Sequence, residues 1–561
     1  MSKLVTAIVL LLAAHLCAAT TSRSAGLYRF FDKLEKGQQV TVAAIGGSIT
    51  MRRSGWARKT VDKIREAYPE NEIRFVNAGV SGSGSNLAVF RLQRDVIAHR
   101  PDLVFIEFVI NDGGAPDAAC VRNLESIVVG LKQCPQTPAI VFVQCAHRMG
   151  ANRRRHARVA AHYNLMSVDM QAAVRELMQD RDLQWDDLFG DDVHPNERGH
   201  ALYARELWQR LKPYATPAEE GRKTPPLPKP LASEGLVLDG RLISPGYEMS
   251  GWSYDAESGN GWWLRFFEGS LQSDQTAGTF HLPFYGRTIG LWLLVKHGRG
   301  RVRVVVDGEL LKEVRAFRPS WYYQHYVHNN LLDDRWHVLS LIPIGVNDKP
   351  PIVRIGYLLA SDQTQAPEPT PEFWQTTWTQ SRAQAADVAG MRWRVLPVTN
   401  WQVIGPFGGE AAKPWLDPAE DLDRDFGVQM REHPELGREL SGRDGKSVGW
   451  QTGQGENGWV DLDEMYGLDD RGVAYAYAQL HAARAGMYTL RLSADYFTRL
   501  HVNGKHVHTM LSLHGSKHSP MSIPVDLQRG DNDVWLKIHA GSKGFGFRLE
   551  YPADADLRAG N

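Results

Sequence analysis

Between residues 38 and 213, short apolar runs alternate with longer amphipathic stretches, and this alternation constrains the fold of the chain more than any other feature. The apolar runs predict buried strands, because strands covered on both faces of a parallel sheet form nearly continuous hydrophobic segments. The amphipathic stretches predict helices on both faces of that sheet. We therefore expect a three-layer α/β/α domain with a parallel sheet. Its strands are predicted at 40–45, 73–77, 103–109, 139–144 and 166–168, and its helices at 56–67, 88–98, 121–131, 153–163 and 197–211.

The remaining length of the 561-residue chain leaves room for two further domains. Segments 234–359 and 395–553 contain several short alternating runs and few helical periods, with tight-turn signals at Asp307-Gly308 and Asn503-Gly504. Both segments therefore predict all-β sandwiches. The proline-rich segment 214–233 and the segment 360–394, whose first part is rich in Pro, Gln and Thr, are predicted to be linkers.

The first 19 residues have the pattern of a secretory signal peptide. Lys3 precedes the apolar segment 4–17, and small residues follow it. We therefore expect a secreted or periplasmic protein, with no membrane span, because no later stretch reaches the ~20 apolar residues that a span requires. The 64 basic and 64 acidic residues cancel, which argues against nucleic-acid binding.

Two loops that follow predicted strands carry groups suited to acyl chemistry. Gly46 and Gly47 end the first strand and deliver Ser48 at the strand end, where the reactive groups of open α/β sheets lie. The glycine- and serine-rich loop 77–85 lacks the Gly-Lys-Ser/Thr ending of a phosphate loop, and its backbone N–H groups suit a developing oxyanion. Taken alone, each loop also fits a structural role, as a helix cap or a tight turn.

Two further loops complete the set. Asn111 follows the third strand, where its amide suits the same oxyanion, or where it simply forms a turn. His194 follows Asp191 by three residues, a spacing that lets the carboxylate orient the imidazole as a base for a serine. The neighbouring Asp192 is the alternative partner of His194, and a role for Asp192 or Asn196 as a helix cap is the alternative for the whole loop.

Together and in this order, the four loops resemble the sequence blocks of the SGNH (GDSL-type) hydrolase superfamily over residues 38–213. The resemblance implies a serine esterase with Ser48 as nucleophile, His194 as general base and Asp191 as the residue that orients the base. It also implies an oxyanion hole formed by the N–H groups of Ser48 and Gly82 and the side chain of Asn111. No metal and no organic cofactor is implied.

Two positions depart from the family pattern. The usual Asp before the serine is Gly47 in this chain, and the usual Gly two residues before the asparagine is Val109. These changes concern loop support rather than proton transfer. The α/β-hydrolase pattern Gly-x-Ser-x-Gly fits less well, since it needs a glycine where Thr50 stands.

The two predicted β domains indicate the class of substrate. The last one resembles the galactose-binding-like jelly rolls of carbohydrate-active enzymes, and the middle one resembles the jelly roll of some carbohydrate esterases. Trp321, Tyr322 and Tyr323 suit stacking on sugar rings, and they suit core packing equally well. We therefore expect a carbohydrate O-acetylesterase that acts on an acetylated polysaccharide or oligosaccharide. A lipid or aryl esterase of the same superfamily and a non-catalytic secreted carbohydrate-binding protein are the alternatives.

Three cysteines remain after the predicted signal peptide: Cys120, Cys134 and Cys145. Cys120 and Cys134 flank one predicted helix and would lie about 21 Å apart, beyond the reach of a disulfide. Their spacing resembles no zinc site. We expect buried free thiols, with one disulfide involving Cys145 as the alternative.

Overall fold

The chain forms two compact units, one from residues 1–113 and 117–241 and one from residues 114–116 and 242–561. The predicted signal peptide lies outside the described residues. The computed structural model describes residues 25–216, 226–245, 251–255, 266–274, 277–346, 348–408, 418–430, 433–467, 472–495, 497–511, 520–540, 544–553 and 555–560.

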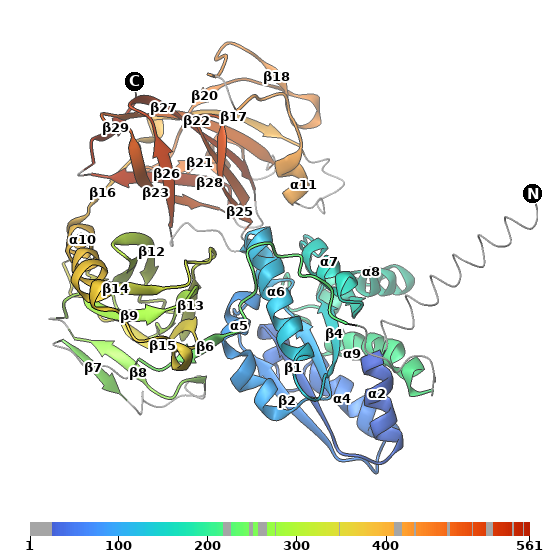
Figure 1. The fold of residues 1–561 in the computed structure, drawn as a ribbon. Helices are drawn as coiled ribbons and strands as arrows, with labels where there is room; N and C mark the ends of the chain where they lie inside the picture. The colour runs from blue at the N-terminus through green and yellow to red at the C-terminus, as the bar shows by residue number, and fades with distance from the viewer. Residues whose placement is uncertain are drawn as a thin grey trace, which may run out of the picture. The chain divides into compact units, whose positions relative to one another are not determined.

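The first unit contains the expected parallel sheet, flanked by helices (Figure 1). The strand order is β2-β1-β3-β4-β5, so the chain direction across the sheet reverses between β1 and β3. Ligands of open α/β sheets bind at this switch point, beyond the carboxyl ends of the strands. The loops after β1 and β3 carry Ser48 and Asn111. The strands are β1 (Val40–Gly46), β2 (Ile73–Gly79), β3 (Leu103–Glu107), β4 (Ala139–Gln144) and β5 (Met166–Asp169).

Helices cover both faces of this sheet, and α4 and α9 have the bounds expected from the sequence. Helices α5, α6 and α7 pack on one another in order, and α4, α8 and α9 form a second group. The α/β/α prediction is therefore confirmed. The helices are α2 (Ala25–Glu35), α3 (Ser48–Met51), α4 (Trp56–Ala67), α5 (Ser85–Asp95), α6 (Asp117–Lys132), α7 (Arg154–His162), α8 (Met170–Arg181) and α9 (Glu197–Leu211).

The unit extends past both ends of the segment expected from the sequence. Helix α2 packs so closely on β4 that a Cβ on Gly26 would lie 2.9 Å from the Cα of Ala139. At the other end, the N–H groups of Leu231 and Ala232 each donate to the carboxylate of Glu125 on α6, at 2.7 Å. Within segment 214–233, residues 231 and 232 are therefore bonded to α6 instead of running free as a linker.

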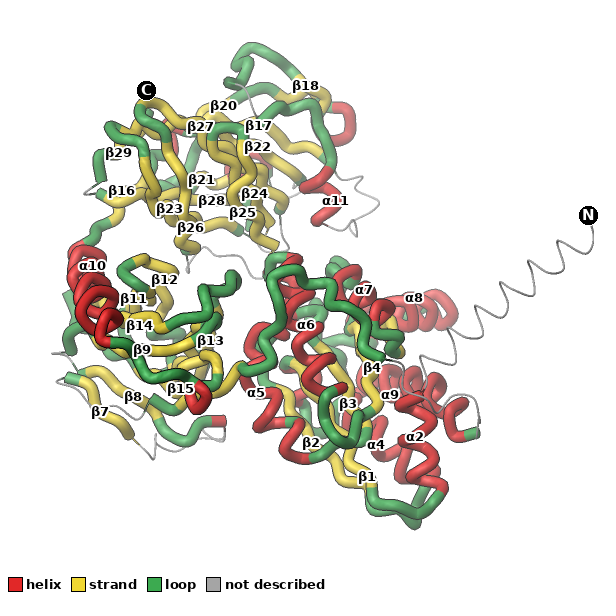
Figure 2. The backbone as a smooth tube through the Cα atoms, in the orientation of Figure 1, coloured by secondary structure: helices red, strands yellow, loops and turns green. Residues whose placement is uncertain are grey.

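The second unit contains two antiparallel β-sandwiches, as predicted, and strands predominate along its backbone trace (Figure 2). In the first sandwich, sheets ordered β13-β10-β15-β8-β7 and β12-β11-β14-β9 enclose the core. Asp307 and Gly308 have positive φ and form the tight turn between β11 and β12. The strands from the start of this region are β6 (Gly240–Ile243), β7 (Trp252–Asp255), β8 (Ser270–Ser273), β9 (Phe280–Tyr285), β10 (Ile289–Leu294), β11 (Arg301–Val306), β12 (Glu309–Arg315), β13 (Tyr323–Val327), β14 (Trp336–Ile344) and β15 (Arg354–Ser361).

The second sandwich pairs the sheets β16-β28-β23-β26 and β20-β17-β22-β27-β24-β25, and Asn503 and Gly504 form the expected turn between β24 and β25. Strand β21 joins β28, β29 joins β22, and β18 pairs with β19. The elements are β16 (Trp393–Val395), β17 (Gln402–Phe407), α11 (Pro418–Asp423), β18 (Leu440–Ser441), β19 (Ser447–Val448), β20 (Gln451–Thr452), β21 (Val460–Asp461), α12 (Leu462–Tyr466), β22 (Val473–Ala482), β23 (Gly486–Ala494), β24 (Phe497–Val502), β25 (Lys505–Leu511), β26 (Met521–Leu527), β27 (Gly530–His539), β28 (Gly546–Pro552) and β29 (Leu557–Ala559).

The segment 360–394 differs from the expected linker because half of it is helical. A π-helical turn, η8 (Phe373–Trp378), leads into α10 (Thr379–Gly390). Ala385 and Val388 of α10 are buried against Val305 and Ile342 of the first sandwich. This helix therefore covers the outer face of a sheet instead of spanning a gap between domains.

Candidate active site

Ser48 begins the short helix α3, just after β1, which lies between β2 and β3 in the sheet. Glycine is required at both of the positions that precede Ser48. A Cβ on Gly46 would lie 2.2 Å from Thr50 Oγ1, and a Cβ on Gly47 would lie 2.2 Å from Asn111 Oδ1. The missing side chain at position 47 therefore makes room for Asn111.

His194 lies within hydrogen-bond distance of both Ser48 and Asp191. The Ser48 Oγ atom is 2.8 Å from His194 Nε2, and His194 Nδ1 is 2.7 Å from Asp191 Oδ2. The second oxygen of Asp191 accepts the N–H groups of Val193 and His194, each at 2.8 Å. Ser48, far away in the sequence, therefore forms one continuous chain of hydrogen bonds with His194 and Asp191.

Asp191 is set up to remain ionised. Partial burial opposes ionisation, but the N–H groups of Val193 and His194 and the His194 ring outweigh it and hold the pKa of the carboxyl below its usual value. The Trp185 indole donates to the backbone oxygen of Asp191 at 2.7 Å and stacks on Phe189, which fixes the loop. An ionised Asp191 favours the proton on Nδ1 and leaves Nε2 to accept the proton of Ser48.

Asp192 has a different partner. Its carboxylate lies 3.4 Å from the Nε atom of Arg148, and its backbone oxygen accepts the Arg148 N–H. The hydrogen bond to the imidazole is therefore made by Asp191, the residue that the spacing favoured.

The expected oxyanion groups lie next to the Ser48 turn. Asn111 contacts Gly47, as described above, and a Cβ on Gly79 would lie 2.3 Å from Met51 N, so the end of β2, which leads into the loop with Gly82, packs against α3. Gly82 in that loop has a φ of 68°, a conformation that favours glycine. The roles of Ser48 N–H, Gly82 N–H and Asn111 as oxyanion donors stay predictions.

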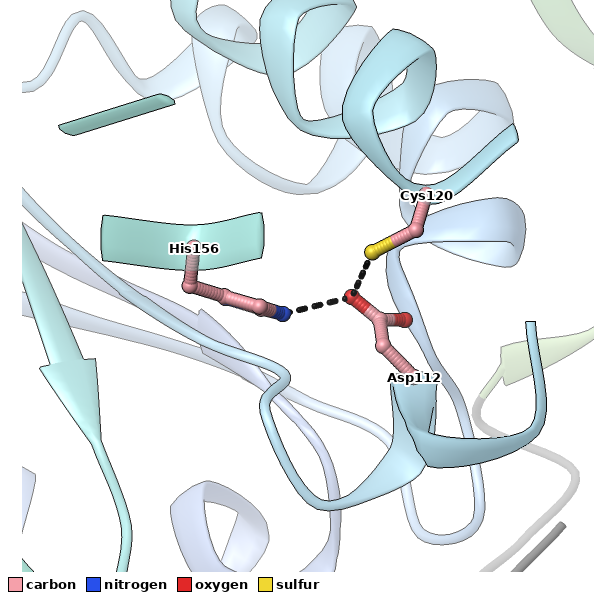
Figure 3. Close-up of side chains that lie close together, drawn as sticks. All are labelled: Asp112, Cys120 and His156. Carbon is pink, nitrogen blue, oxygen red and sulfur yellow. Dashed lines mark hydrogen bonds and ion pairs between the residues drawn. The ribbon is translucent and has the colours of Figure 1, made fainter. Parts of the chain in front are cut away.

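A buried polar cluster supports the loop that carries Asn111 (Figure 3). Asp112 Oδ2 accepts from Cys120 Sγ at 3.6 Å and lies 3.0 Å from His156 Nε2. The other oxygen of Asp112 accepts the N–H and the hydroxyl of Ser85 at the start of α5. Asp112 therefore ties the loop after β3 to α5, α6 and α7.

The same cluster is the group of possible metal ligands found among the described residues, since its three ligand atoms lie within 4.8 Å of one another. Asp, Cys and His are ligands that transition metals accept. Here Asp112 is the shared partner of Cys120 and His156, through a hydrogen bond to the thiol and a 3.0 Å contact with the imidazole. We assign them a structural role beside Asn111.

The structure also describes the three aromatic residues expected to stack on sugar and the three cysteines. Tyr323 is 5% exposed and its ring packs against Trp292, which fits the packing alternative, and stacking on sugar stays a prediction for it. Trp321 is 39% exposed and Tyr322 is half-buried, and a sugar-binding role for them stays a prediction. The three cysteines are free and buried, as expected: Cys120, Cys134 and Cys145.

Two buried charged residues near Ser48 were not anticipated from the sequence. Glu107, at the end of β3, bonds to the turn that carries Ser48. Arg91 on α5 donates to the backbone oxygens of Gly46 and Ala78, which lie at the ends of β1 and β2. A signal for Glu107 existed, since it is a single acidic residue in an otherwise apolar strand.

Comparison with known proteins defines the class. Residues 44–202 match the model of the GDSL-like lipase/acylhydrolase family. An acetylxylan esterase from Geobacillus stearothermophilus is 30% identical over 186 aligned positions, which cover 29% of this chain and 84% of that protein. The protein is therefore a carboxylic ester hydrolase. It belongs to the GDSL-like lipase/acylhydrolase family, and the resemblance found in the sequence is confirmed.

Solved structures extend the similarity beyond the first unit. A two-domain esterase active on acetylated mannans, co-crystallized with mannopentaose, matches with a TM-score of 0.53 at 21% identity, covering 62% of this chain and 97% of that chain. A second crystal structure of such an esterase gives a TM-score of 0.54 at 22% identity, covering 60% of this chain and 95% of that chain. At this identity the match shows a shared fold.

Proposed function

We propose that the protein is a secreted carbohydrate O-acetylesterase that uses Ser48, His194 and Asp191 for catalysis. The observation that carries the proposal is the hydrogen-bond chain from Ser48 Oγ through the His194 ring to Asp191, with distances of 2.8 and 2.7 Å. A hydroxyl, an imidazole and a carboxylate in this arrangement perform acyl transfer on many unrelated folds.

The reaction follows from the geometry. The Ser48 oxygen attacks the ester carbonyl while His194 Nε2 takes its proton, and Asp191 stabilises the imidazolium that forms. The carbonyl oxygen becomes an oxyanion, which the N–H groups of Ser48 and Gly82 and the Asn111 amide stabilise. His194 then protonates the leaving sugar oxygen, and an acetyl-enzyme remains. Water, deprotonated by His194, attacks this ester and releases acetate and free Ser48.

The choice of substrate rests on the relatives and on the exposure of the site. The relatives described above act on acetylated xylan and acetylated mannans. The side chains of His194 and Asp191 are 46% and 56% exposed, so an acetyl group carried on a bulky chain can approach them. The signal-peptide pattern of residues 1–19 supports export, where such polymers occur. None of the described helices is long and apolar enough to cross a membrane.

Acetate release from a panel of acetylated polysaccharides, measured beside hydrolysis of long-chain nitrophenyl esters, tests this proposal. We expect release from at least one acetylated glycan and much slower hydrolysis of the long-chain esters. The reverse preference would favour a lipid or aryl esterase. Glycan binding without acetate release, and without labelling of Ser48 by a fluorophosphonate, would mean a non-catalytic binding protein.

A further inference from the structure

We propose that Glu107 is a positioning residue for the reaction, holding the turn that carries Ser48 through one carboxyl oxygen. Glu107 is the last residue of β3 and is fully buried. Its Oε2 atom accepts the Gly47 N–H at 3.2 Å and the Thr50 hydroxyl at 2.8 Å. These two donors stand on either side of Ser48, so a single oxygen fixes both ends of the turn. The inference rests on the proposed role of Ser48.

The turn leaves space for the carboxyl group of Glu107 because residue 46 is a glycine. In the sheet, Glu107 is the register partner of Gly46, and a Cβ on Gly46 would lie 2.8 Å from Glu107 Oε2. The glycine therefore admits the Glu107 side chain beneath the turn. Gly47, the residue that precedes α3, has no side chain that could cap the helix. Its own N–H donates to Glu107 of β3.

The bond to Glu107 also separates the roles of the two successive backbone N–H groups in the turn. The Gly47 N–H donates to Glu107, which orients the peptide plane between Gly46 and Gly47, one residue before Ser48. The next N–H group, that of Ser48, is the one proposed to bind the oxyanion. A small rotation of this turn would move both the hydroxyl and the N–H of Ser48, and misplacement of reacting groups by about 1 Å costs about 10²-fold in rate.

The proposed role of Glu107 needs Oε2 as a hydrogen-bond acceptor and does not need a negative charge on the carboxyl group. Burial raises the pKa of Glu107 to about 7, with Asp112 contributing in the same direction and Thr50, Gly47 and Cys145 opposing it. Both bonds go to Oε2, so a carboxylic acid protonated on the other oxygen makes them as well. A glutamine can present its carbonyl oxygen in the same place, and it should therefore substitute for Glu107.

Three variants test the assignment by their rate of labelling with a small fluorophosphonate, which reports the reactivity of Ser48 without a glycan. Glu107→Ala loses the acceptor and should be labelled about 10–100-fold more slowly than the wild type. Thr50→Val removes one donor without opening a cavity and should slow labelling by about threefold to tenfold. Glu107→Gln should stay within about threefold of the wild type, since it keeps the acceptor.

The matched control is Thr60→Val, because Thr60 is also buried and its hydroxyl bonds within α4 to the oxygen of Trp56. It should leave labelling unchanged. On an acetyl ester, Glu107→Ala and Thr50→Val should lower kcat with KM unchanged when kcat is calculated per folded enzyme molecule, since partial unfolding by itself lowers the apparent kcat. Far-UV circular dichroism identifies the folded variants.

Wild-type rates in folded Glu107→Ala and Thr50→Val would overturn the inference, as would a Glu107→Gln variant as slow as Thr50→Val or slower. If Glu107→Ala does not fold, the labelling rates of the other three variants decide the test. Thr50→Val must then be labelled more slowly than both Thr60→Val and Glu107→Gln. Failure of the proposed function looks different, since in that case the wild type itself is not labelled.

Discussion

Replacing Ser48 by alanine should abolish ester hydrolysis while leaving the protein folded. The Ser48 hydroxyl bonds to His194 and is only half-buried, so its loss removes the nucleophile without leaving a buried group unpaired. We expect kcat to fall by about 10⁴–10⁶-fold, since the remaining groups cannot form the acyl-enzyme. Acetate release from the best acetylated substrate measures this effect.

The control for Ser48→Ala is its stability. The melting temperature should stay within about 2 °C of the wild type, since one exposed hydrogen bond contributes little. A folded Ser48→Ala protein with more than a few per cent of wild-type activity would mean that another residue is the nucleophile.

Replacing Asp191 by asparagine should have the second-largest effect. Asparagine keeps the size of the side chain but removes the charge that stabilises the imidazolium, and its NH₂ group can hold the ring in the wrong tautomer. We expect kcat to fall by about 10³–10⁴-fold. The pH dependence of kcat and kcat/KM on a soluble acetyl ester should be measured for the variant and the wild type.

Asp192→Asn is the matched control for this effect, since the two aspartates are neighbours in one loop. Asp192 pairs with Arg148 on the surface, and surface ion pairs contribute little to stability. Its kcat should stay within about threefold of the wild type. Equal losses in the two variants would show that the wrong carboxylate has been assigned.

Much of the first unit could be predicted from local pattern. The buried strand 139–144 and the helices 56–67 and 197–211 have the observed bounds, because a continuous apolar run and a 3.6-residue period each specify one kind of element. Helix α2 was missed because it directly follows the signal-peptide pattern. Helix α10 was missed because the proline-rich start of its segment suggested a linker, and only packing against the sheet reveals its role.

In the site too, residues that belong to a local motif could be predicted, and contacts that depend on the tertiary structure could not. Ser48, Asp191 and His194 were predicted because motif and spacing are visible in the sequence. The contact between Gly47 and Asn111 could not be predicted, since it joins loops after two different strands. Glu107 and Arg91 act through hydrogen bonds to backbone groups far away in the sequence, and no local pattern reveals such bonds.

The most direct test of the account is to trap the acetyl-enzyme. The protein is mixed with a rapidly cleaved acetyl ester, quenched in acid within the first turnover, digested and examined by peptide mass spectrometry. The proposed mechanism predicts an acetyl group on the peptide that contains Ser48, and on the hydroxyl of that residue. Acetate release with no acetylated peptide from the wild type, and at an undiminished rate in Ser48→Ala, would contradict it.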